Sequence, residues 1–172
     1  LGEKGEKASI TSAAAVSTPF DLASSANALN KGFSKIYQRH FLNLLRKSAK
    51  RKFMELPPLF NCGNLNNIKT LREFDDRVTA PLHGFSNAEH YYSESSCKKF
   101  LKNIRIPTLI MNSIDDPFLD KETFPSQKEV PEMVKLEYLK KGGHAGFISG
   151  NPWNKFGWVD FRIPIFFKEQ FI

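Results

Sequence analysis

The chain has 172 residues, of which 41% are hydrophobic and 25% are charged, and its formal net charge is +7. This length is enough for one domain with a substantial core, and the sixteen Phe residues must be buried or line a pocket. No run of about 18 apolar residues occurs, so we expect no transmembrane helix, and the N-terminus does not have the pattern of a signal peptide. Cys62 and Cys97 form neither a CxxC nor a zinc pattern. We therefore expect a reduced, cytoplasmic protein.

Much of the positive charge comes from one basic segment, residues 46–52, which contains Arg46, Lys47, Lys50, Arg51 and Lys52. Such a cluster could form a patch for nucleic acid or anionic lipid. It could equally be the solvated C-terminal end of an amphipathic helix, where cations favour the helix dipole. The segment has no interleaved aromatic residues and no nucleic-acid motif beside it, which favours the helix end. We therefore expect no nucleic-acid partner.

The first half of the chain predicts one strand and a long helical region. Residues 10–16 predict a short buried strand, which Pro19 would end. Residues 21–30 are small and polar. Apolar residues with helical spacing then predict an amphipathic helix of about four turns; they are Phe33, Ile36, Tyr37, Phe41, Leu44 and Leu45. Residues 68–74 predict another short helix.

The second half predicts an α/β arrangement. Residues 93–103 predict a helix, residues 107–112 and 134–139 two strands, and residues 158–171 a C-terminal helix in which Pro164 fits only in the first turn or at a kink. Strands that alternate with helices indicate a parallel sheet. The segment from about 21 to 85 is too long for a simple crossover between strands, and so predicts an inserted helical cap.

The residues that could carry chemistry follow two of the predicted strands. Asp115 and Asp116 come directly after the strand at 107–112, and His144 lies in a glycine-rich loop after the strand at 134–139. In a parallel sheet, active groups lie beyond the C-terminal ends of the strands. A carboxylate that orients a histidine produces the general base needed for nucleophilic attack. The alternatives are a solvated Asp-Asp-Pro turn and a surface histidine, but an acid and a histidine at two successive strand ends favour catalysis.

The remaining histidines predict no further site. His40 lies beside the apolar stripe of the predicted amphipathic helix, and His83 and His90 lie among aromatic residues, where packed or half-exposed histidines are common. No arrangement of His, Asp or Glu has metal-ligand spacing. We therefore expect neither a metal nor another cofactor.

The sequence contains no recognisable nucleophile for this acid and base. The order Asp then His is that of the second half of an α/β-hydrolase triad, whose serine sits in G-x-S-x-G at a strand-to-helix turn. The chain contains no such pentapeptide, and it predicts too few strands before the acid for a complete hydrolase sheet. The sequence thus predicts that residues upstream of Leu1 are missing from it.

Several segments together resemble one known family. Residues 104–118 (I-x-x-P-T-L-I-M-N-x-x-D-D-P-F) and 142–147 (G-G-H-x-G-F) are similar to the YheT-like α/β-hydrolases, as are the segments 31–39, 72–80 and 83–92. The resemblance covers nearly the whole chain. It implies that residues 1–172 are the C-terminal part of an α/β-hydrolase domain, with the cap at about 21–85 and the acid and histidine in 104–172.

The resemblance also implies an activity and its residues. It implies a serine esterase that acts on small acyl esters, with His144 as the base and the acid in the pair Asp115 and Asp116. Asp116 is preferred because it lies nine positions after Pro107, as the acid does in related hydrolases, and Asp115 stays an alternative. The serine would lie about ten residues before Leu1, so this chain by itself should be inactive. The other hypothesis is a truncated, inactive product or a non-catalytic binding module that uses the basic segment 46–52.

Overall fold

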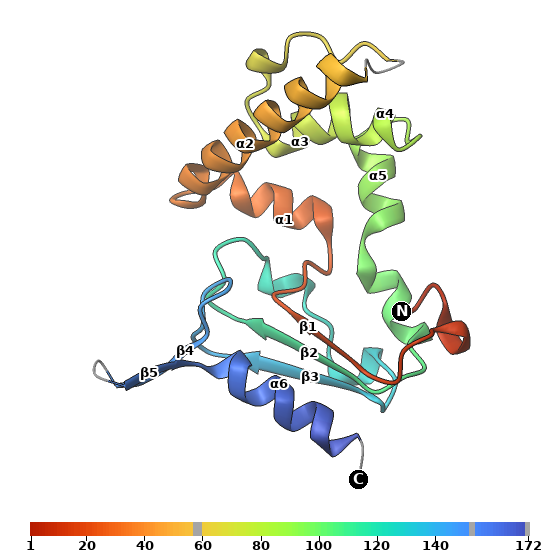
Figure 1. The fold of residues 1–172 in the computed structure, drawn as a ribbon, viewed down its shortest axis with the longest axis vertical. Coiled ribbons are helices and arrows are strands. Elements are labelled where there is room, and N and C mark those ends of the chain that lie inside the picture. The colour runs from red at the N-terminus through yellow and green to blue at the C-terminus, as the bar shows by residue number, and fades with distance from the viewer. Residues whose placement is uncertain (57–59, 152–153, 171–172) are drawn as a thin grey trace. The chain divides into compact units, whose positions relative to one another are not determined.

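The structure is a computed structural model that describes residues 1–56, 60–151 and 154–170. It contains two compact units (Figure 1). The sheet unit comprises Leu1–Phe20 and Cys97–Ile172, and the helical unit comprises Asp21–Ser96. No helix among the described residues is both long and apolar enough to cross a membrane.

The sheet unit is built on three parallel strands in the order β1 (Ala13–Val16), β2 (Thr108–Ser113) and β3 (Val134–Leu139). In register, Ala13 pairs with Thr108, which pairs with Val134 on its other side. Every residue of the central strand β2 is buried, as expected for a parallel strand covered on both faces. The predicted α/β fold with a parallel sheet is confirmed.

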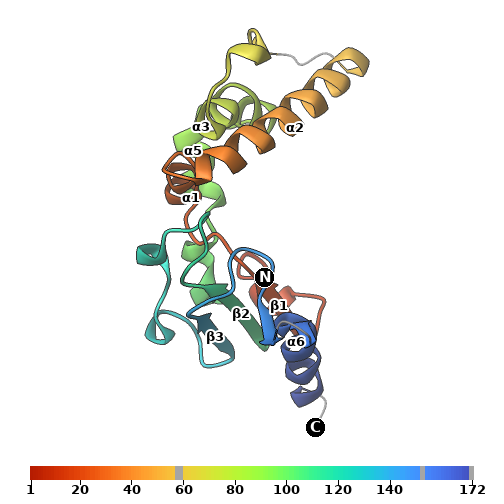
Figure 2. The same cartoon turned by 90° about the vertical axis from the view of Figure 1, so that its left-hand side faces the viewer.

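Alternate residues of the strands face two separate cores. On one face, Leu109 and Met111 pack with Phe166 of helix α6 (Trp158–Glu169), which runs along the sheet in both ribbon views (Figures 1 and 2). On the other face, Ile110 and Val134 form a cluster with several residues from outside the sheet, among them Leu101 of the 3₁₀ helix η4 (Cys97–Asn103). The sheet is therefore covered on both sides, as in α/β folds.

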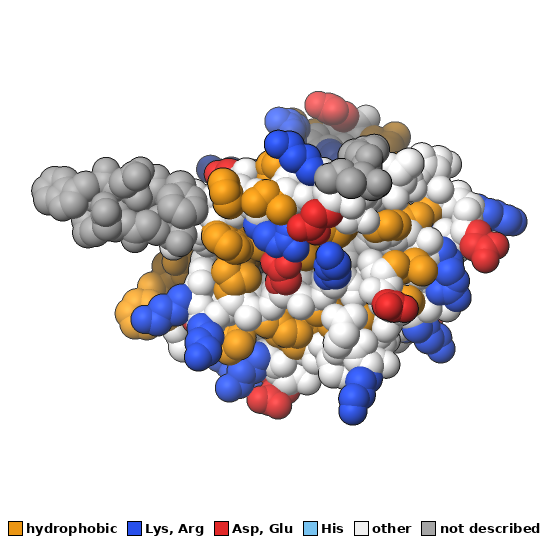
Figure 3. Space-filling view, turned by 90° about the horizontal axis from the view of Figure 1, so that it is seen from below, with side chains coloured by type: hydrophobic (Ala, Val, Ile, Leu, Met, Phe, Trp, Pro, Cys, Tyr) orange, Lys and Arg blue, Asp and Glu red, His pale blue; other side chains and the backbone are white. Residues whose placement is uncertain are grey.

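Ion pairs also join β3 to α6. Arg162 Nη2 lies 2.6 Å from Glu137 Oε1, and Lys135 Nζ lies 3.4 Å from Glu169 Oε2. The charged residues of β3 thus meet charges on the helix. Pro164 lies in the middle of α6 and not in its first turn. The face of the molecule seen from below mixes hydrophobic side chains with Lys, Arg, Asp and Glu (Figure 3).

A small hairpin comes between β3 and α6 along the chain. Strands β4 (Ile148–Asn151) and β5 (Asn154–Gly157) pair antiparallel in a separate two-stranded sheet. The sequence did not predict this hairpin, because its strands lack an alternating apolar pattern.

The helical unit contains α1 (Leu22–Leu29), α2 (Ser34–Glu55), α3 (Leu71–Phe74), α4 (Ala80–Leu82) and α5 (Ala88–Ser95), with a short π-helix (Asp75–Thr79) between α3 and α4. Its core gathers Leu42, Ile68, Phe74 and Val78. Helix α1 was not predicted. Asp21 begins it, because its Oδ1 accepts a hydrogen bond of 2.7 Å from the Ser24 backbone N–H.

Two helix predictions need correction. Helix α2 exists and is longer than predicted, but its apolar stripe faces solvent, with exposed fractions of 85% at Phe33 and 64% at Ile36. The buried side of α2 instead includes Gln38, whose amide bonds Asn30 and the backbone of Leu71. The predicted helix at 93–103 is two elements, α5 and η4, interrupted at Ser96.

Candidate active site

The candidate acid lies in the tight turn that follows β2. Asp116 has a fully buried side chain, and its Oδ1 accepts a 2.9 Å hydrogen bond from the Phe118 backbone N–H. The backbone of Ile114 still pairs with Leu139 of β3. The turn after β2 therefore starts beside the end of β3, which leads into the loop that carries His144.

The two loops bring Asp116 and His144 into direct contact. His144 Nδ1 lies 2.9 Å from Asp116 Oδ2, and the imidazole is 41% exposed while the carboxylate is not exposed. The Phe118 ring packs against the imidazole with a centroid distance of 4.6 Å. Within the described residues, Nε2 of His144 has no hydrogen-bond partner. A carboxylate on Nδ1 holds the imidazole in the tautomer whose Nε2 can accept a proton.

Asp115 makes a different set of contacts. Its Oδ1 accepts hydrogen bonds from the Ser113 hydroxyl at 2.5 Å, from Gly142 N–H at 3.0 Å and from Gly143 N–H at 2.9 Å. The Ser113 hydroxyl, followed by the Gly143 N–H, holds the pKa of the Asp115 carboxyl below its usual range. Asp115 thus binds the backbone of the glycine loop, whereas its neighbour Asp116 binds the imidazole.

Two glycines shape the loop before His144. Gly143 has φ of +60°, a left-handed conformation that side chains disfavour. A Cβ at Gly142 would lie 2.9 Å from the Phe147 ring and 3.1 Å from Ser113 Oγ. Phe147 is 1% exposed, and its N–H donates to the Gly142 carbonyl at 2.9 Å. The loop therefore closes tightly on a buried ring, with no room for a side chain at position 142.

Ser17 makes a contact with the His144 loop that the sequence did not predict. It follows β1 with φ of +54°, and its hydroxyl donates to the backbone carbonyl of His144. Asn112 holds the next residue, because its side chain exchanges hydrogen bonds of 2.8 and 3.2 Å with the Thr18 backbone. Since the Ser17 hydroxyl is directed at the carbonyl and not at the imidazole, it is not arranged as a nucleophile. The only sequence signal was a serine directly after a predicted strand.

The other residues considered from sequence lie elsewhere. His40, His83 and His90 belong to the helical unit, and the His90 ring is bonded to Ser86 at 3.2 Å. No group of three His, Cys, Asp or Glu side chains able to hold a metal ion occurs in the described ranges. Cys62 and Cys97 are free thiols.

Comparison with known proteins gives several relatives. The chain is 38% identical to YheT, a candidate esterase of Escherichia coli (strain K12), over 95% of this chain and 49% of that protein. It is 32% identical to a monoacylglycerol lipase of Saccharomyces cerevisiae, over 89% of this chain and 36% of the lipase. It is 29% identical to human phospholipase ABHD3, over 87% and 37%. The chain thus spans about half the length, or less, of the curated relatives it matches. No protein-family model matches it.

Proposed function

Because this chain belongs to the family of α/β-hydrolases that includes YheT, we propose that it supplies the acid and the base of a carboxylic ester hydrolase. The observation that carries the proposal is the hydrogen bond of 2.9 Å between Asp116 Oδ2 and His144 Nδ1. No residue that the structure describes forms a hydrogen bond with Nε2 of the same ring. The names of the relatives, which include an esterase and two kinds of lipase, support an acyl ester as the substrate.

In the proposed reaction, His144 Nε2 takes the proton of a serine hydroxyl as the oxygen attacks the ester carbonyl, and then gives that proton to the leaving alcohol. Asp116 keeps Nδ1 protonated and stabilises the imidazolium that forms. Its complete burial favours this role, since a carboxylate shielded from water interacts more strongly with a cation beside it.

Asp115 acts in this proposal as a positioning residue and not as the acid. Its carboxylate already accepts three hydrogen bonds from Ser113, Gly142 and Gly143. Those bonds fix the backbone immediately before His144. In this proposal Asp115 therefore orients the loop, and Asp116 orients the imidazole ring.

The nucleophile in the proposal is a serine outside this chain. The chain has no G-x-S-x-G, and its Ser17 hydroxyl is bonded to a carbonyl. We assign the role of a cap to the helical unit, Asp21–Ser96. Its exposed Phe33, Ile36 and Leu44 offer apolar surface of the kind that binds an acyl chain.

The experiment is a His144→Ala substitution in the complete protein, assayed with a p-nitrophenyl ester. We expect kcat to fall by about 10⁴-fold, because the serine would lose its base. His83→Ala is the matched control, since His83 is an exposed histidine of the helical unit, and it should keep normal turnover. Unchanged turnover of a folded His144→Ala protein would refute the proposal.

A further inference from the structure

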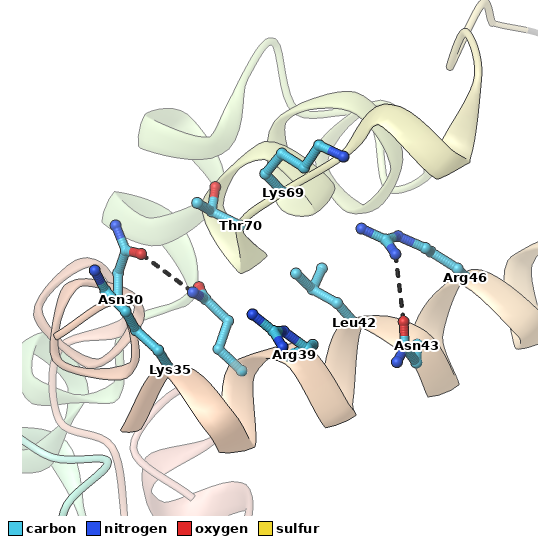
Figure 4. Close-up of a pocket in the computed structure, with 9 residues that line it drawn as sticks. Asn30, Lys35, Arg39, Leu42, Asn43, Arg46, Lys69 and Thr70 are labelled. Atoms are coloured by element: carbon cyan, nitrogen blue, oxygen red, sulfur yellow. Dashed lines mark hydrogen bonds between the residues drawn. The ribbon is translucent and has the colours of Figure 1, made fainter. Parts of the chain in front are cut away.

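Helix α2 borders a hollow in the surface of the helical unit, with a volume of about 560 Å³ (Figure 4). Arg39, Leu42 and Arg46 rise into it from α2, while Lys69 and Thr70 lie across from them on the segment before α3. This volume falls within the usual range for small-molecule sites. The hollow lies entirely within one unit.

The lining of the hollow is strongly positive. Its charged residues are Lys35, Arg39, Arg46 and Lys69, and no Asp or Glu lines it. Within the described part of the chain none of the four forms an ion pair with a carboxylate, in contrast to Arg72, which lies 2.6 Å from Glu89. Four cations without counter-charges in a concave surface create a field that attracts anions.

A carboxylate does approach the edge of this hollow, but it is engaged elsewhere. Glu73 Oε2 accepts a hydrogen bond of 2.5 Å from the backbone N–H of Lys69, and Glu73 N–H donates to Thr70 Oγ1. Glu73 thus caps the start of α3 and does not pair with the Lys69 ammonium. The positive charge of the lining remains uncompensated.

Several polar groups of the hollow are held in place before any ligand binds. Arg46 Nη1 donates to Asn43 at 3.3 Å and Nη2 donates to the Ile68 carbonyl. The Arg46 Nε is buried and has no hydrogen-bond partner among the described residues. Gln38 donates to Asn30 at 3.1 Å. The bonds to Asn43 and Ile68 use two of the five guanidinium N–H groups and hold Arg46 in place. A guanidinium that is already ordered loses less conformational freedom when it binds an anion.

The chemistry of the lining selects among anions. The neutral side chains add amide and hydroxyl donors, which match the several acceptor oxygens of a phosphate group. Four cations suit the charge of about −2 on a phosphate monoester better than the single charge of a carboxylate. No aromatic side chain lines the hollow, so it offers no platform for stacking a nucleobase.

We infer that this hollow, which we call the α2 pocket, binds the phosphate group of an anionic ligand, either a soluble phosphate monoester or the headgroup of a phospholipid. The inference does not depend on the proposed hydrolysis. The α2 pocket uses Arg39 and Lys69 in the helical unit, whereas the acid and the base lie in the sheet unit.

The test measures binding of inorganic phosphate and glycerol 3-phosphate to the complete protein by calorimetry at constant ionic strength, with acetate as the comparison anion. Flotation with vesicles of phosphatidylcholine, with and without phosphatidic acid, tests whether the bound phosphate group belongs to a lipid.

The pocket variant is Arg39→Gln with Lys69→Gln. Both side chains are exposed and neither makes a hydrogen bond within the described structure, so folding should persist. Lys47→Gln with Arg51→Gln is the matched control, because it removes the same charge from exposed positions of the same unit.

We expect the pocket variant to weaken phosphate binding by at least about tenfold, and the control variant to bind as the wild type does. The charge-retaining pair Arg39→Lys with Lys69→Arg should restore binding. Binding only to vesicles with phosphatidic acid, with the same dependence on variants, would assign the phosphate to a lipid. Equal losses in both variants, equal affinity for acetate, or no binding of any probe would overturn the inference. His144→Ala should leave phosphate binding unchanged, which separates this result from the test of hydrolysis.

Discussion

Asp115 and Asp116 are adjacent and chemically identical, yet their surroundings differ completely. The turn after β2 directs Asp116 inward, where its side chain is not exposed and meets His144. It leaves Asp115 exposed beside the amides of Gly142 and Gly143. Hydrogen-bond donors around each carboxylate therefore distinguish the two residues, and they favour Asp116 as the acid of the proposed triad.

This difference predicts unequal effects of two matched substitutions in the complete protein. Asp116→Asn should lower kcat by about 10⁴-fold, because an amide does not stabilise the imidazolium and favours the wrong tautomer. Asp115→Asn should lose less than about 100-fold, because the amide oxygen can still accept the loop hydrogen bonds. Steady-state kinetics with a p-nitrophenyl ester measures both. A larger loss for Asp115→Asn would reverse the assignment.

For single residues, the sequence predicted that an aspartate of this pair orients His144, but it did not predict the contact that supports the histidine loop. The pair Asp115 and Asp116 and the base His144 were predicted from their positions after two strands, and their catalytic roles stay predictions. The contact from Ser17 to the His144 carbonyl spans 127 residues of sequence. No local pattern reports a hydrogen bond over such a separation.

At the level of elements, the two glycines Gly142 and Gly146 of the loop at 142–147 differ in the space around them. A Cβ at position 142 would overlap the Phe147 ring and crowd Ser113, so these neighbours would have to shift, whereas a Cβ at Gly146 would make only ordinary contacts of 3.6 Å or more. The two positions are four residues apart in one loop. They therefore form a natural pair for comparison.

We expect Gly142→Ala to lower the free energy of unfolding by about 1–3 kcal/mol, because the new methyl group would overpack a buried site. Gly146→Ala should change it by no more than about 1 kcal/mol, since the new methyl group would make only ordinary van der Waals contacts at an exposed position. Urea denaturation monitored by tryptophan fluorescence measures both. Equal stabilities of the two variants would contradict the tight closure of the loop.

The bounds of the strands were predicted more accurately than the packing of the helices. Strand β3 matches its predicted range of 134–139, and β1 begins at Ala13, three residues later than predicted. The buried side of α2 was not predicted, because Leu42 packs inward there together with Gln38, whose amide is hydrogen-bonded, while Phe33 of the apolar stripe is exposed. A buried amide with satisfied partners cannot be recognised from periodicity.

For the whole molecule, the most informative feature is the way that the helical unit is connected. It is continuous in sequence from Asp21 to Ser96 and is inserted, along the chain, between β1 and β2. Its two ends meet, because Leu22 N–H donates to Ser96 Oγ at 3.0 Å. It also has its own core around Leu42 and Ile68. These are properties of an inserted segment that can fold by itself.

We therefore expect a peptide of residues 21–96 to fold without the rest of the chain. Far-ultraviolet circular dichroism should show a helical spectrum and a cooperative thermal transition, because the core of the unit is internal to it. Replacing Phe74, which is 5% exposed, with Ala should lower the melting temperature, whereas Lys47→Ala on the surface should not. A disordered spectrum of the unaltered peptide would show that the helical unit depends on the sheet unit.

By itself, the sequence determined the fold class, the three parallel strands and the residues that follow the ends of β2 and β3, because these depend on local hydrophobic pattern and on the topology of parallel sheets. The tertiary structure decided which aspartate contacts His144, which side of α2 is buried, and that four cations separated in sequence line one hollow. These features depend on hydrogen bonds and charges between distant residues, and such contacts exist only once the chain has folded.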